Sequence, residues 1–81
     1  MATYKCDVKQ QFGKFHGFAW KVGDPQGNPV CKDQATANAA VDQVVGALKS
    51  GGFGQGDEVI FRDTAYATLQ ELQGVMQRSR Y

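Results

Sequence analysis

The sequence predicts a single α+β domain with the element order β-β-β-α-β-α. Three observations predict it. Polar and apolar side chains alternate along the first 32 residues, which is the pattern of half-buried strands. From about residue 34 the apolar spacing changes to that of an amphipathic helix. The length of 81 residues leaves room for one domain only.

The first two strands are expected over residues 3–10 and 14–22, with a turn at Gln11-Phe12-Gly13. One face of the second strand carries His16, Phe18, Trp20 and Val22, and the other carries Phe15, Gly17, Ala19 and Lys21. Phe18 and Trp20 share their face with the apolar Val22, which favours a core position for both rings. The small residues Gly17 and Ala19 permit close approach of another element on their own face.

The strongest turn signal follows at residues 24–28, where Pro25 presets one turn position and Gly27 or Asn28 supplies a positive φ. A short third strand is expected over residues 29–32. Its leading Pro29 suits an edge strand, because proline cannot donate to a ladder of hydrogen bonds.

Two helices are expected, separated by a fourth strand. Asp33 is the candidate N-cap of a helix over residues 34–49, which the glycines after Ser50 end. The fourth strand is expected over residues 57–61. Asp63 or Thr64 then caps the second helix, whose apolar stripe comprises Ala65, Leu69, Leu72 and Met76.

A helix between the third and fourth strands is a crossover, so the fourth strand is expected to lie parallel to the first. The predicted sheet is a three-stranded antiparallel meander plus one parallel strand, in the order 3-2-1-4, with both helices packed on it. A sheet covered on one face only leaves the other face exposed, together with the edge of the fourth strand. We therefore expect a homodimer or a protein partner at that face or edge, the exposed aromatic set being Phe15/Ala19 or Phe18/Trp20.

Composition narrows the function classes. Nine Lys and Arg against eight Asp and Glu give a net charge of +1, which argues against a dedicated nucleic-acid binder with a strongly basic surface. No stretch reaches the roughly 18 apolar residues of a membrane span. Cys6 and Cys31 are expected about 9–10 Å apart, on strands separated by a third, which is too far for a disulfide. Free thiols favour a cytoplasmic protein.

Charge is unevenly placed along the chain, which favours contacts with a partner. Residues 1–32 carry five Lys and two Asp, for a charge of +3, whereas residues 33–63 carry −3. The candidate binding residues are Phe15, Lys21, Phe53, Arg78 and Arg80. The partner is expected to be a protein or a nucleoprotein complex, and base stacking on the aromatic side chains of residues 12–20 keeps nucleic acid possible. The glycine-rich loop 51–56 follows a helix and precedes a strand, the reverse of a phosphate loop, and is interpreted as a connector.

Three carboxylates carry an alternative, enzymatic interpretation. Asp7 and Asp63 are expected on neighbouring strands, and Asp42 on the first helix. Convergent carboxylates bind Mg²⁺ or Mn²⁺, and such ions can catalyse phosphodiester cleavage. In the competing interpretation no metal binds: Asp63 caps a helix, Asp42 is solvated and Asp7 pairs with a lysine.

Several strings resemble the ribonuclease H family: Tyr4-Lys5-Cys6-Asp7, Gly17-Phe18-Ala19-Trp20-Lys21-Val22, Thr36-Ala37-Asn38 with Ala47-Leu48, and Val59-Ile60-Phe61-Arg62-Asp63-Thr64-Ala65-Tyr66. The resemblance implies a ribonuclease H-like topology and, in the alternative, a minimal metal-dependent nuclease acting on RNA or an RNA–DNA hybrid with Asp7, Asp42 and Asp63. The chain departs from the family after Asp7, where Val8-Lys9 stands, and lacks its last strand, last helix and last acidic residue. We therefore expect a small non-enzymatic binding module, of the kind that phages and mobile elements encode as anti-CRISPR-like inhibitors.

Overall fold

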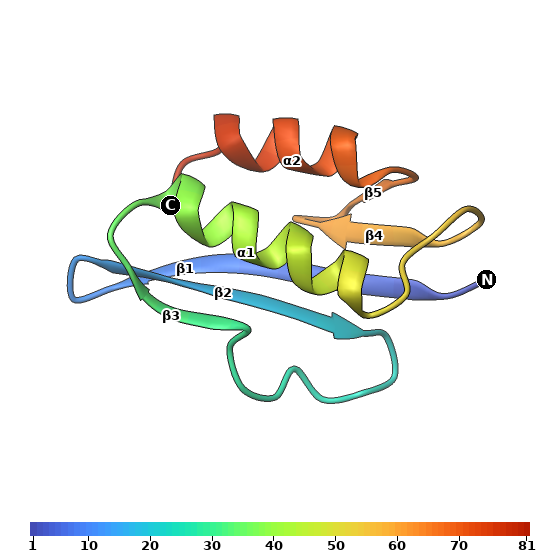
Figure 1. Cartoon of the computed structure of the whole chain (residues 1–81), viewed down its shortest axis with the longest axis horizontal. Coiled ribbons are helices and arrows are strands. Elements are labelled where there is room, and N and C mark those ends of the chain that lie inside the picture. The colour runs from blue at the N-terminus through green and yellow to red at the C-terminus, as the bar shows by residue number, and fades with distance from the viewer.

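The computed structural model describes residues 1–81 and confirms the α+β fold (Figure 1). The elements are β1 (Thr3–Gln11), β2 (Lys14–Lys21), β3 (Cys31–Gln34), α1 (Ala37–Ser50), β4 (Glu58–Phe61), β5 (Thr64–Tyr66) and α2 (Leu69–Arg78). They form one sheet in the order β3-β2-β1-β4-β5. The β1–β4 pair is parallel, as the crossover through α1 predicts, and the other pairs are antiparallel.

The fifth strand, β5, was not expected. Arg62 and Asp63 both have positive φ, at 51° and 69°, and form a two-residue turn that returns the chain alongside β4. The interpretation of Asp63 or Thr64 as a helix cap is therefore wrong. The cap of α2 is Thr68, whose hydroxyl accepts a hydrogen bond from the Glu71 amide at 3.2 Å.

The first helix also begins later than expected. Thr36, and not Asp33, is the N-cap of α1, and its hydroxyl accepts a hydrogen bond from the Ala39 amide at 3.1 Å. The third strand, β3, occupies residues 31–34 instead of 29–32, and Asp33, with a φ of 57°, lies where its register with β2 shifts. At 14 and 10 residues, neither α1 nor α2 has the length and apolar character that a bilayer crossing requires.

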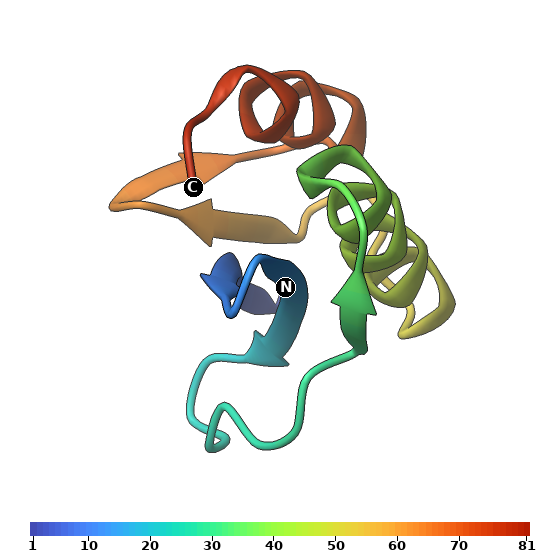
Figure 2. The same ribbon diagram turned by 90° about the vertical axis from the view of Figure 1, so that its left-hand side faces the viewer.

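Both helices lie on the same side of the sheet, and no helix lies on the other side (Figure 2). The single core lies between the helices and this inner face, and it consists of Cys6, Val8, Ala40, Val41, Val44, Leu48, Val59, Phe61, Leu72 and Met76. Burial raises the pKa of the Cys6 thiol to about 12, with a further contribution from the Asp7 carboxylate. The two cysteines lie on β1 and β3 with β2 between them, and both are free thiols, as predicted.

Gly17 is a point of close approach between α1 and the sheet. A Cβ atom at this position would lie 2.7 Å from Val44 Cγ2, 2.9 Å from Cys31 Sγ and 3.3 Å from the Ala40 carbonyl oxygen. The sequence-based expectation that Gly17 admits a close neighbour is thereby confirmed. The contact makes Phe15, Gly17 and Ala19 the inner set of β2, so the expected core position of Phe18 and Trp20 is wrong.

We predict that Gly17→Ala lowers the free energy of unfolding by roughly 1–3 kcal/mol, because the added methyl group overpacks the contact between β2 and α1. The matched control is Gly46→Ala, since a Cβ at Gly46 of α1 meets nothing within 4 Å. That variant is expected to gain roughly 0.5–1 kcal/mol from helix propensity. Urea denaturation of both variants measures the difference, and a Gly17→Ala protein as stable as the parent would contradict the packing.

Candidate functional site

The outer surface of the sheet, named here the helix-free face, is covered by neither helix. Residues that pair directly across strands share a face, and the register pairs Lys5 with Trp20, Asp7 with Phe18 and Lys9 with His16. Ile60 of β4 lies beside Lys5 on the same face. Because Cys6, Val8, Val59 and Phe61 point into the core, these intervening residues point away from the helices.

Two aromatic rings lie near the middle of the helix-free face. Phe18 and Trp20 are separated by one residue on β2, so they stand side by side on the same surface, and both are only partly buried. The Lys9 Nζ lies 5.1 Å from the centroid of the Phe18 ring, a cation–π contact that places an ammonium group over this ring. The rings therefore lie at the surface, where a partner can reach them.

A small depression of about 200 Å³ adjoins Trp20, and its lining residues are Lys5, Cys6, Asp7, Trp20, Ile60, Arg62 and Asp63. Asp7 and Asp63 therefore line one cavity, as the carboxylate hypothesis expects. Asp42 does not join them: it lies on α1, where it accepts a hydrogen bond from Gln73 Nε2 of α2 at 2.8 Å. The chain brings together no group of three His, Cys, Asp or Glu side chains suited to holding a metal ion.

The turn residue Arg62 also anchors the end of the chain, a role that the sequence analysis did not assign. Its guanidinium lies 4.9 Å from the centroid of the Tyr81 ring, and its Nη2 donates to the Arg80 carbonyl at 2.7 Å. The Tyr81 hydroxyl donates to the Met76 carbonyl at 2.8 Å, and burial raises the pKa of Tyr81 to about 12. Arg62 is thus held at the rim of the depression beside Trp20.

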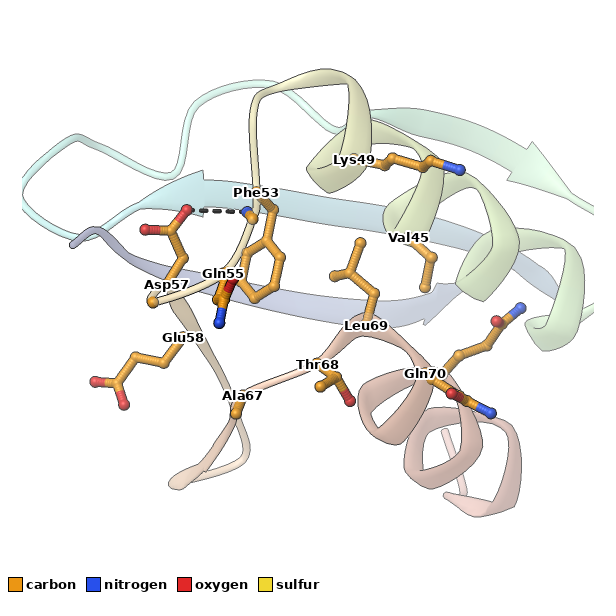
Figure 3. Close-up of a pocket in the computed structure, with 13 residues that line it drawn as sticks. Val45, Lys49, Phe53, Gln55, Asp57, Glu58, Ala67, Thr68, Leu69 and Gln70 are labelled. Atoms are coloured by element: carbon orange, nitrogen blue, oxygen red, sulfur yellow. Dashed lines mark hydrogen bonds between the residues drawn. The ribbon is translucent and has the colours of Figure 1, made fainter.

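A larger hollow of about 860 Å³ lies on the opposite side of the molecule, between the end of α1, the glycine-rich loop and the start of α2 (Figure 3). Val45, Phe53, Ala67 and Leu69 supply its apolar lining, and the remainder is polar, charged or glycine. The Phe53 ring also packs against Tyr4, with the ring centroids 5.7 Å apart. Phe53, expected to contact a partner, therefore has a structural contact as well.

Asp57 fixes the loop at the rim of this hollow. Its two carboxylate oxygens accept hydrogen bonds from the amides of Ala2, at 2.8 Å, and Gly54, at 3.0 Å. These two hydrogen bonds hold the pKa of Asp57 below its ordinary value, and the hydrogen bond from Ala2 has the larger effect. The carboxylate thereby ties the beginning of β1 to the loop that leads into β4.

The five residues expected to bind a partner do not form one surface. Phe15 packs against the core on the inner face. Lys21 and Phe53 both lie next to Tyr4, near the start of β4. Arg78 is the last residue of α2, and Arg80 follows the helix. The Arg80 carbonyl accepts a hydrogen bond from Arg62, which lies just after β4. The expected set is therefore spread over the inner face and both ends of the molecule.

Comparisons of this chain with protein-family models, with curated proteins and with solved structures found no match. The resemblance to ribonuclease H stays a prediction. The geometry described above is thus the basis for assigning a function.

We predict that the two hydrogen bonds to Asp57 make stability depend on acid pH. Their contribution is fully present above the unfolded-state pKa of about 3.9 and is lost as the pH falls through the lower folded-state value. The free energy of unfolding of the parent protein should therefore fall more steeply between about pH 5 and pH 2 than that of Asp57→Asn. Denaturation at several pH values measures the two slopes.

The control for this experiment is Asp24→Asn, which alters an exposed carboxylate in the loop after β2. This variant is expected to keep the slope of the parent protein. Equal slopes for the parent protein and Asp57→Asn would show that the Asp57 carboxylate does not stabilise the fold.

Proposed function

We propose that this chain is a small non-enzymatic binding module that attaches to an anionic partner through the helix-free face of its sheet. The observation that carries the proposal is the pair Phe18 and Trp20, partly buried on a face that neither helix covers. Aromatic rings surrounded by polar groups are typical of binding surfaces, because they bury a large apolar area when a partner covers them.

The charges on this face favour an anionic partner. Lys5 and Lys9 lie on it by their register with β2, and strand alternation adds Lys14 and Lys32. The β1–β2 hairpin as a whole carries four lysines, and Asp7 is its one carboxylate. A local excess of cations attracts a polyanion even though the whole chain has a net charge of only +1.

The narrower roles expected from the sequence stay predictions within this proposal. A nucleoprotein complex is one anionic partner of the required kind, and an inhibitor encoded by a phage or mobile element would act by occupying such a complex. The two free cysteines favour a cytoplasmic protein. The alternative nuclease has less support, because Lys5 and Arg62 line the cavity of Asp7 and Asp63, and Asp42 lies elsewhere.

The predicted homodimer finds less support at this face than a separate partner does. Two copies that met face to face would bring Lys5 and Lys9 of one copy close to the same lysines of the other, and like charges repel. The β4 edge, also considered for association, is occupied by β5. The outer edges of β3 and β5 are the strand edges that a second copy could pair with.

The test is the binding of heparin, a polyanion without aromatic groups. Isothermal titration calorimetry at low salt measures the affinity. Lys9→Gln removes one charge from the helix-free face and is expected to weaken binding several-fold. Lys49→Gln removes one charge from α1, on the other side of the sheet, and is expected to leave the affinity unchanged. Absence of heparin binding, or equal losses in the two variants, would overturn the proposal.

A further inference from the structure

The geometry points to single-stranded nucleic acid as the occupant of the helix-free face, with its bases stacked on Trp20 and Phe18 and its phosphates beside the surrounding lysines. This inference rests on the proposed function and specifies the chemical class of the anionic partner. A single strand needs two features on the same face. One is flat rings on which its bases can stack, and the other is cations on the neighbouring strands that can pair with its phosphates.

The surroundings of the two rings match this ligand. Trp20 borders the depression of about 200 Å³ whose lining includes Lys5 and Arg62, so a base on the indole would lie beside residues that carry positive charge. Phe18 has Lys9 over its ring at 5.1 Å. A base that replaces this ammonium group on the ring leaves Lys9 free to pair with the adjacent phosphate.

Asp7 lies opposite Phe18 in the register, and its Oδ1 accepts a hydrogen bond from the Val8 amide at 2.8 Å. Asp7 and Asp63 repel phosphate, which confines the favourable region for a backbone to the lysines of the β1–β2 hairpin and to the Arg62 rim. A carboxylate next to stacked rings can also accept hydrogen bonds from the amino groups of bases. A phosphate group has no such amino group to donate, so this contact favours a base at the position next to Asp7.

A single strand is favoured over a duplex because of the balance between charge and stacking. Duplex binding without base contacts depends on neutralising many phosphates. The five cations of this face and its rim, with the two nearby carboxylates Asp7 and Asp63, supply little of that. In a duplex the bases are stacked on each other and do not offer their planes to Phe18 or Trp20. A single strand offers both its bases and its phosphates, so each ring adds affinity that a duplex cannot use.

The experiment is a set of titrations with a 12-nucleotide oligo(dT), a 12-nucleotide oligo(U), a 12-base-pair duplex DNA and heparin. Trp20 is the one tryptophan of the chain, so its fluorescence reports directly on the proposed stacking site. We expect both single strands to quench this fluorescence and to bind more tightly than the duplex. Comparing oligo(dT) with oligo(U) separates DNA from RNA as the source of the strand.

Trp20→Leu is expected to weaken oligonucleotide binding by about tenfold to a hundredfold and to leave heparin binding unchanged, because it removes the ring and retains an apolar side chain. Phe18→Leu is the second variant, and it serves if Trp20→Leu does not fold. It retains Trp20, so the fluorescence of Trp20 still measures its binding. The matched control is Tyr66→Leu, since Tyr66 of β5 pairs with the buried Val59 and packs against the core on the inner side of the sheet; this variant is expected to leave oligonucleotide binding unchanged.

The outcomes separate the inference from the proposed function. Heparin binding that depends on Lys9, combined with a duplex affinity equal to or above that of the single strands, would overturn the single-strand inference and leave the polyanion surface intact. Oligonucleotide binding that survives both Leu variants would also overturn it. Failure to bind heparin and all the oligonucleotides would overturn both.

Discussion

The contact between α1 and Gly17 of β2 determines which side chains of this protein are available to a partner. An extra Cβ at Gly17 would lie 2.7 Å from Val44, so the helix rests against the backbone of the strand. Alternation along β2 then sends Phe15 and Ala19 toward the helices and Phe18 and Trp20 to the other side. The register with β1 places Lys5 and Lys9 beside those two rings. One close packing contact thus assembles the aromatic and basic face.

The outer face is uncovered because both helices pack on the inner side of the sheet. They close one core there, where Leu72 and Met76 of α2 lie beside the buried residues of α1. The outer side therefore carries partly buried rings among exposed lysines, and the proposed single strand would use both, by stacking on the rings and by pairing its phosphates with the lysines.

The sequence was sufficient to predict the topology of the sheet and not all of its elements. The change of apolar period near residue 34 and the crossover rule correctly predicted the parallel β1–β4 pair. The strand β5 was missed because Arg62 and Asp63 form a turn with positive φ at both positions without the glycine or asparagine that usually marks one. The N-caps were displaced by three to five residues, since Thr36 and Thr68 compete with nearby aspartates of similar capping preference.

The proposed binding surface was harder to predict, because its position depends on which face of β2 is buried. Phe18, Trp20 and Val22 are more hydrophobic than Phe15, Gly17 and Ala19, and hydrophobicity alone favours the first set for the core. Packing reverses this preference, because only the set with Gly17 permits α1 to approach the strand. The carboxylates illustrate the same dependence: the β1–β4 pairing brings Asp7 and Asp63 to one cavity, whereas hydrogen bonding to Gln73 holds Asp42 against α2.

The most direct measurement of the central claim is acrylamide quenching of Trp20 fluorescence in the folded, unliganded protein over a range of protein concentrations. We predict that acrylamide reaches the indole, because no helix covers the ring, and that quenching does not change with concentration, because we assign this face to a polyanion and not to a second copy. Emission characteristic of an apolar interior with almost no quenching would contradict the account, since it would place Trp20 in a core or a self-association interface.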